Sequence, residues 1–318
     1  MGKNRLFIEE FGFALFSQQL LFRVLRKLIP VQSVKDHLYK REHTFKRRVL
    51  GKELGPVIDS LVQRVPLEAT SVVNKTIWVF WWQGNQNEIP LVSTCLNSLE
   101  RQKRADVELV ILTKDNLSDY CTIPPILKEK FEAGVITITH FSDIVRMALL
   151  AQRGGVWLDA TVYAVSDFSY IFEHTLWSMR KPVDTHQYIP MGRWSAYAIG
   201  SGQGNPVAVL MLALFEAYWE RHQCMIDYFL VDYSLDLLCE RVPQVRASID
   251  SIKPNNPQAL ALQSYLNKPF DQGIYESLCT DTQLFKLSRR EKLHEMQGEI
   301  RTLYGWLLDK GNRHEETG

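Results

Sequence analysis

One short stretch of the sequence places two carboxylates and a guanidinium close together. Asp143 and Arg146 stand three residues apart at the start of a predicted helix, so both side chains share one face of it. The rest of that helix is apolar on nearly every side, which predicts burial. A buried carboxylate and guanidinium must pair with each other or with a ligand. The guanidinium fork suits hydroxyl or phosphate oxygens, and the carboxylate accepts hydrogen bonds from sugar hydroxyls.

The strand predicted over residues 156–165 carries the second carboxylate, Asp159. Its apolar flanks place it inside a sheet, where a carboxylate needs a cation. A divalent Mg²⁺ or Mn²⁺ that bridges a diphosphate suits this hard oxygen ligand. Thr161 lies two residues further on, points the same way in a strand and adds a hydroxyl ligand. The purely structural alternative is an ion pair at a helix end, between Asp143 and Arg146, and a turn residue at Asp159.

Aromatic and polar side chains end the first predicted strand, over residues 76–82. Trp81 and Trp82 can stack on a planar base, but alternation sends them to opposite sides of the sheet, so only one faces the site. The alternative is that both indoles belong to the core. Gln83 comes next and can bind a base or ribose edge. Late in the chain, Lys286 in an apolar setting can hold a diphosphate as a point charge.

Two further acids, Asp227 and Asp232, are candidates for the catalytic carboxylate. They stand five residues apart on a predicted helix, about 140° around it from each other, so they cannot serve one point equally. One of them is expected to face the reacting group of a bound substrate. The neighbouring rings of Tyr228, Phe229 and Tyr233 would raise the proton affinity of such a carboxylate, which suits a base. The alternative is charge on a helix surface.

Strands and helices alternate along the first half of the chain. Such alternation with short links predicts an α/β fold, with a mostly parallel, Rossmann-type sheet covered by helices on both faces. Ligands of such sheets bind beyond the carboxyl ends of the strands. From Arg193 onward the chain is expected to be mainly helical. The predicted strands are 76–82, 107–112, 135–139 and 156–165, and the predicted helices are 91–101, 125–131, 143–152 (capped by Ser142), 206–222 and 227–241.

The N-terminal segment differs in charge from the rest of the chain. Residues 1–52 hold 12 Lys or Arg and 4 Asp or Glu, a net charge of +8, whereas the remaining residues have a net charge of −7. Residues 6–29 repeat apolar side chains at helical spacing and stop at Pro30, which predicts an amphipathic arm. Such an arm with basic flanks can lie on an anionic membrane. The alternative is an arm packed on the body with solvated lysines.

These patterns divide the chain and limit its partners. We expect an N-terminal arm over 1–69, a body over 70–290 and a charged tail over 291–318. Within the body, 70–190 is expected to be the half with the sheet and 191–290 the helical half. Nucleic acid is not an expected partner, because the body is acidic. Five scattered cysteines without a CxxC pair, and the absence of a signal peptide or an uncharged apolar run of membrane-spanning length, predict a cytoplasmic protein.

Several of these residues together resemble a known family. Residues 142–146, the Gly154-Gly155 pair and residues 157–161 resemble the signature of the capsular polysaccharide synthesis proteins. That family is related to glycosyltransferase family 32 and has a GT-A type fold. The resemblance extends in the right order over roughly residues 74–288, through segments 77–84, 216–219, 226–233 and 285–287.

The resemblance implies retaining transfer of a hexose, such as glucose or galactose, from a UDP-sugar to a lipid-diphosphate-linked saccharide. Residues 70–190 would then bind the nucleotide sugar and residues 191–290 the acceptor. Asp227 or Asp232 would face the donor anomeric carbon or the acceptor hydroxyl. It implies that Asp143 and Arg146 hold donor-sugar hydroxyls and that Asp159 meets the metal and the donor. The sequence departs from the wider family where the usual Asp-x-Asp reads Asp159-Ala160-Thr161. The missing carboxylate weakens the metal site or relaxes its requirement. Two other functions stay open, a sugar-phosphate transferase and a non-catalytic assembly protein at the membrane.

Overall fold

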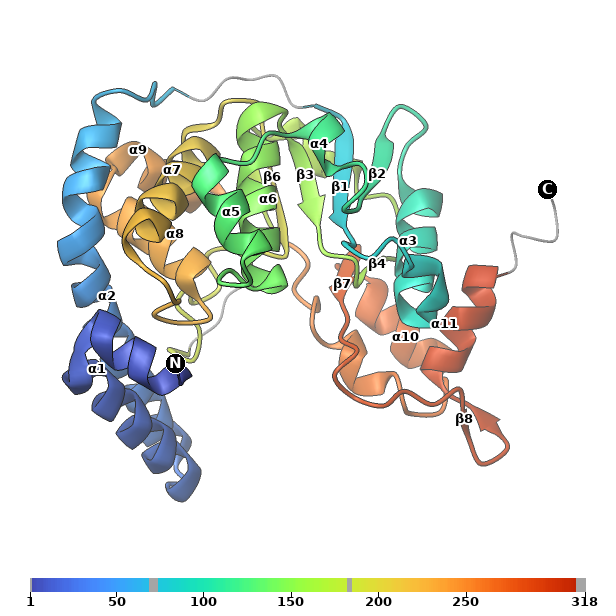
Figure 1. Ribbon diagram of the computed structural model, residues 1–318. Coiled ribbons are helices and arrows are strands. Elements are labelled where there is room, and N and C mark those ends of the chain that lie inside the picture. Colours follow the sequence, from blue (N-terminus) through green and yellow to red (C-terminus); the bar gives the residue numbers. More distant parts are fainter. Residues whose placement is uncertain (1, 69–73, 182–184, 313–318) are drawn as a thin grey trace.

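A mostly parallel sheet of five strands forms the centre of the molecule. The computed structural model describes residues 2–68, 74–181 and 185–312 (Figure 1). The strands of the sheet are β1 (Thr76–Phe80), β2 (Glu108–Leu112), β3 (Gly155–Leu158), β5 (Leu176–Ser178) and β6 (Ala198–Ser201). Their order is β2-β1-β3-β6-β5, with β1 parallel to both neighbours and β6 antiparallel to β3 and β5. The predicted α/β fold class is therefore confirmed.

Helices pack on both faces of this sheet. The main ones are α3 (Pro90–Gln102), α6 (Ile138–Gln152) and α7 (Pro206–Arg221). Side chains alternate along a strand, so Trp78 and Trp157 point into the core that includes α6 and α7. Ile77 and Val156 point the other way, into a second core with α3. The remaining short helices are α4 (Leu117–Tyr120), α5 (Pro125–Glu132), α9 (Pro243–Ser251) and α10 (Gln272–Cys279), and the 3-10 helices are η1 (Gln86–Glu88), η2 (Ser169–Glu173) and η3 (Leu262–Tyr265).

The strand predicted over residues 135–139 is wrong, because α6 begins at Ile138. The hydroxyl of Thr137 accepts a hydrogen bond from the backbone N–H of His140 and caps the helix. Ser142, the predicted cap, lies inside α6. The N–H groups of residues 135 and 136 both donate to the carbonyl of Lys130 at the end of α5. These two N–H groups are therefore not available to a strand ladder.

The single strand predicted over residues 156–165 is divided in two. β3 ends at Leu158, and a turn follows in which the N–H of Val162 donates to the carbonyl of Asp159 at 2.8 Å. The second part, β4 (Val162–Ala164), leaves the main sheet and pairs antiparallel with β7 (Leu284–Lys286). Asp159 therefore lies just past the carboxyl end of β3 rather than inside a strand.

The N-terminal residues form two long helices, α1 (Lys3–Leu28) and α2 (Gln32–Val62). α1 is kinked at Gly12, whose φ of 83° and ψ of 157° are not helical. α2 packs against α7 and α8 (Leu230–Arg241), and Figure 1 shows it at the left of the molecule, beside these helices. The arm is thus docked on the body. The predicted boundary between them, at residues 69 and 70, lies outside the described residues.

The C-terminal part of the chain is folded onto the body. The charged tail predicted over 291–318 is wrong as far as residue 312, and residues 313–318 lie outside the described part of the chain. Residues 291–312 contain the hairpin β8 (Met296–Gln297) and β9 (Ile300–Arg301) and the helix α11 (Leu303–Asn312). α11 packs against α3, with Leu303 and Leu307 buried. The charged residues that suggested a tail lie mostly in the exposed segment before this helix.

Candidate functional site

Arg146 joins the two carboxylates that the sequence placed near it. α6 holds Asp143 and Arg146 one turn apart, and Arg146 Nη1 donates to Asp143 Oδ1 at 2.5 Å. Its other terminal nitrogen, Nη2, lies 3.4 Å from Oδ1 of Asp159 at the end of β3. The guanidinium also covers the ring of Trp157 at 4.8 Å, and the indole N–H of that residue donates to Asp159. Asp143 and Arg146 are buried, which fixes this arrangement.

Lys286 brings a second cation to Asp159 from a distant part of the chain. The pairing of β4 with β7 places Lys286 opposite Val162. Its Nζ lies 3.1 Å from Oδ2 of Asp159 and 2.5 Å from the hydroxyl of Thr161. We call the five side chains that meet here the carboxylate–cation cluster; they are Asp143, Arg146, Asp159, Thr161 and Lys286.

The charges of the carboxylate–cation cluster balance, because it contains two carboxylates and two cationic side chains. Burial raises the pKa of Asp159, but the positive charges of Lys286 and Arg146 outweigh it and hold the pKa below its usual value. Asp159 is therefore ionised at neutral pH. Fixed charges in this setting can bind the hydroxyls of a sugar and the oxygens of a phosphate.

The residues present do not fit a metal ion held by the protein. Asp159 and Thr161, the predicted metal ligands, do lie together, but the ammonium of Lys286 contacts both of them. Mg²⁺ and Mn²⁺ require about six oxygen ligands. In the described ranges, no three His, Cys, Asp or Glu side chains come together as a metal site. One carboxylate and one hydroxyl beside a lysine make a poor site for a dication.

Asp232 is a third acid beside the cluster. It is buried on α8, where Oδ1 accepts a hydrogen bond of 2.9 Å from the indole N–H of Trp194. Burial raises its pKa to about 7; the charge of Asp143 acts in the same direction, and Trp194 and the charge of Arg146 oppose it. Asp143 and Arg146 of the cluster therefore both influence the charge of Asp232. A carboxyl with this pKa can exchange a proton near neutral pH.

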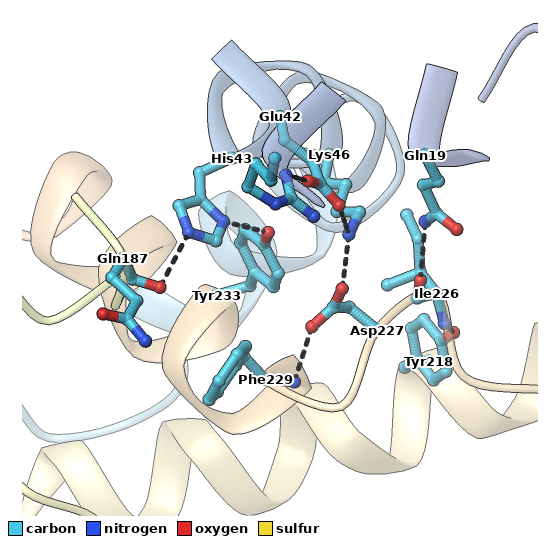
Figure 2. Close-up of polar contacts among 11 residues, drawn as sticks. Gln19, Glu42, His43, Lys46, Gln187, Tyr218, Ile226, Asp227, Phe229 and Tyr233 are labelled. Atoms are coloured by element: carbon cyan, nitrogen blue, oxygen red, sulfur yellow. Dashed lines mark hydrogen bonds and ion pairs between the residues drawn. The ribbon is translucent and has the colours of Figure 1, made fainter. Parts of the chain in front are cut away.

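The carboxylate of Asp227 pairs with the arm and not with the residues of the cluster. The helix predicted from residue 227 begins only at Leu230, and Oδ1 of Asp227 accepts a hydrogen bond from the N–H of Phe229 at 2.9 Å. Oδ2 forms an ion pair with Lys46 of α2, as Figure 2 shows. Lys46 is buried and also binds Glu42 at 2.7 Å. Asp227 therefore joins the arm to the start of α8.

The two tryptophans after β1 lie in different surroundings. Trp82 packs edge-on against Phe131 and Phe141, at 5.2 and 5.6 Å between ring centroids, and belongs to the core. Trp81 donates its indole N–H to Asn85, and the guanidinium of Arg289 lies 4.9 Å above its ring. Trp81 is therefore the one of the pair that remains available for stacking on a base. Gln83 is exposed in the turn that follows β1.

Sequence reasoning missed four side chains around the cluster. The ring of Tyr197 lies 5.6 Å from Lys286 Nζ, and Trp194 binds Asp232. Both precede β6, a strand too short to give a periodic signal. Arg289 and Arg290 follow Lys286 in the chain. The pKa of the Tyr228 phenol is raised, first by burial and then by the charge of Asp143. The charge of Arg290 opposes this rise.

Comparison with known proteins adds independent information. The family model described as "Capsular polysaccharide synthesis protein" matches residues 26–306. The O-glycosyltransferase braB of Annulohypoxylon truncatum is 23% identical over 160 residues, which are 46% of this chain and 38% of that protein. The chain thus spans less than two fifths of that relative.

Two solved glycosyltransferase structures are similar at low identity. The PaToxG glycosyltransferase has a TM-score of 0.41 and 15% identity, over 65% of this chain and 82% of that one. The apo structure of the bifunctional glycosyltransferase WbbM has a TM-score of 0.40 and 8% identity, over 78% of this chain and 50% of that one. The family match, which spans most of the chain and includes the whole carboxylate–cation cluster, is the decisive finding. This chain belongs to the family of capsular polysaccharide synthesis proteins.

Proposed function

We propose that this protein is a retaining glycosyltransferase of capsular polysaccharide synthesis. It moves a hexose from a UDP-sugar to a lipid-linked saccharide at the inner face of the plasma membrane. The observation that carries the proposal is the guanidinium of Arg146 held between Asp143 and Asp159, with Lys286 on the far oxygen of Asp159. Membership of the family and a glycosyltransferase among its relatives support the same activity.

The cluster offers separate groups for the two ends of a donor. Asp143 and Arg146 would bind the hydroxyls of the hexose, because a carboxylate accepts and a guanidinium donates hydrogen bonds. Lys286 has three N–H donors; two point to Asp159 and Thr161, and the third would bind a phosphate oxygen. Trp81 would stack on the base. Because its pKa is lowered, Asp159 carries a negative charge that holds Lys286 and Arg146 in place around it.

Charge that develops on the departing UDP needs cations nearby. Lys286 and Arg146 supply two fixed positive charges at this point, and preorganised charges are the most effective form of electrostatic stabilisation. The Mn²⁺ or Mg²⁺ expected from the sequence would have to displace Lys286 from Asp159 and take most of its ligands from the diphosphate. We therefore assign the stabilising charge to the two side chains.

Asp232 is the carboxyl that we assign to the chemistry of transfer. In a retaining reaction the acceptor attacks the face from which UDP leaves, or an enzyme carboxylate attacks first. Asp232 would serve the first route as a base toward the acceptor hydroxyl and the second as the nucleophile. Its pKa of about 7 suits proton transfer near neutral pH.

A screen of UDP-hexoses tests this proposal. The wild-type chain should release UDP slowly from one donor in the absence of acceptor, and faster with a lipid-linked saccharide. Asp159→Asn should abolish release and keep a native melting curve, whereas Asp281→Asn, a change at an exposed acid outside the cluster, should leave release unchanged. Full activity of Asp159→Asn would sink the proposal. Release of UMP would instead indicate sugar-phosphate transfer, and no calorimetric heat with UDP would indicate an assembly protein.

A further inference from the structure

The outer face of α1 is an exposed apolar stripe. Beyond the kink at Gly12 the helix is continuous, and five large apolar side chains fall within about 100° of its circumference. Their exposed fractions are high for apolar residues: Phe13 68%, Leu20 50%, Leu21 53%, Val24 44% and Leu28 73%. Val31 and Val34 are also exposed and continue this outer stripe around the corner into α2. An exposed patch of this kind marks an interaction site.

The stripe is not the face that packs against the body. On the opposite side of the same helix, Leu15 and Phe22 are buried. Gln19 on that side donates to the carbonyl of Ile226 at 3.3 Å, and Arg26 forms an ion pair with Glu42 of α2. α1 therefore has two apolar faces, and the fold uses only one of them.

Cations border the outer stripe. Arg23 and Lys27 are exposed along one edge of it and form no ion pair within the described residues. The inward-facing cations of the arm are already neutralised, since Lys46 binds Glu42 and Asp227. Further exposed basic side chains lie on α2; they are Lys40, Arg41, Arg48 and Lys52.

The arm points to the same side of the molecule as the carboxylate–cation cluster. In Figure 1, β1 and β3 run downward, so the carboxyl ends of these strands form the lower edge of the sheet. Asp159 directly follows the carboxyl end of β3. The corner between α1 and α2 projects at the lower left. A surface that touches this corner also faces the edge of the sheet where the donor would bind.

We propose that the outer stripe of α1 binds an anionic lipid surface. Its apolar side chains would enter the boundary between head groups and acyl chains, and Arg23 and Lys27 would lie at the level of the lipid phosphates. A second copy of the chain is a poorer occupant, because residues 1–52 carry a net charge of +8 in each copy and would repel one another. The inference concerns the surface alone and does not rest on the reaction.

Sedimentation of the full chain with vesicles tests it. The wild type should pellet with vesicles of phosphatidylethanolamine and phosphatidylglycerol. The double change Leu20→Glu and Leu28→Glu should lower the partition coefficient by about tenfold or more for each leucine. Ile300→Glu is the matched control, because Ile300 is 58% exposed in the hairpin of β8 and β9, away from the arm. It should bind vesicles like the wild type.

The cations are tested separately. Arg23→Gln with Lys27→Gln should weaken binding to the anionic vesicles by about fivefold for each charge and leave binding to phosphatidylcholine vesicles unchanged. All the substituted residues are exposed, so melting curves should stay native.

Three results would overturn the inference: a wild type that stays in the supernatant, an equal loss in Ile300→Glu, or a wild-type dimer that Leu20→Glu with Leu28→Glu converts to a monomer. None of these readouts uses a donor, so a chain that transfers no hexose would still report on lipid binding.

Discussion

Nζ of Lys286 lies 3.1 Å from Oδ2 of Asp159, although Lys286 is on β7 of the short sheet and Asp159 follows β3 of the main sheet. The short sheet of β4 and β7 exists beside the main one because the chain turns at Asp159 and leaves β3. The contact therefore depends on the same turn that brings Asp159 to the edge of the main sheet. It also decides what can approach this carboxylate, since an ammonium already neutralises one of its oxygens.

Transfer should persist without a divalent metal. The wild type treated with EDTA is expected to keep most of its UDP release, because Lys286 and Arg146 provide the positive charge. Lys286→Ala should lower kcat by about 10²–10³-fold, and added Mn²⁺ should recover part of that loss at the vacated oxygen of Asp159. UDP release measured with and without Mn²⁺ checks both statements. Complete loss in EDTA, restored by Mn²⁺, would contradict the assignment.

The activity should rise with pH through about 7. Asp232 must be ionised to act as a base or nucleophile, and its pKa is raised to about 7 by burial. Asp232→Asn should therefore lose most of the transfer and any remaining activity should lack this rise. A kcat profile measured across neutral pH gives the answer. An unchanged rise in the Asn variant would show that another group titrates.

The same carboxyl should make the free energy of unfolding fall with pH. Its pKa in the folded chain, about 7, exceeds the ordinary value of 3.8, so the folded state holds a proton that the unfolded state has lost. The associated stability is complete below pH 3.8 and is lost as the pH rises to about 7, with a total of about 4 kcal/mol. Urea unfolding at several pH values should show a shallower fall for Asp232→Asn than for the wild type.

Asp227 and Lys46 should matter for stability rather than for chemistry. Lys46→Ala leaves Glu42 and Asp227 without their shared cation, and breaking a buried ion pair costs about 3–5 kcal/mol. Lys52→Ala, at an exposed lysine of the same helix, should change the free energy of unfolding by less than about 0.5 kcal/mol. Asp227→Asn should keep UDP release per folded molecule. If Asp227→Asn were folded but inactive, Asp227 would have a role in the transfer reaction.

Local patterns in the sequence predicted the parts of the site that are local in the chain. The spacing of Asp143 and Arg146 on one helix was sufficient to place these two side chains together. The strand predicted over 156–165 brought Asp159 near the sheet edge but ran through it. The sequence did not predict the turn at Asp159, because the apolar alternation continues on both sides of it. The capping hydroxyl of Thr137 was hidden inside a β-branched run that reads as a strand.

Contacts between distant segments were beyond the reach of these patterns. No periodicity shows that β7 pairs with β4, so the position of Lys286 came only from its apolar setting and the family resemblance. The partner of Asp227 is on the N-terminal arm, and no feature near residue 227 points to it. The buried side of α11 was concealed by the charged residues that precede it.

The ion pair between Lys46 and Asp227 has a practical consequence for anyone who shortens this protein. A truncation that removes α1 and the first half of α2, in the hope of a more soluble enzyme, would also remove the cation that holds the first turn of α8. Asp232 stands on that turn. The basic N-terminus is therefore joined to the catalytic body by its inner side, even though its outer side is free to meet a membrane.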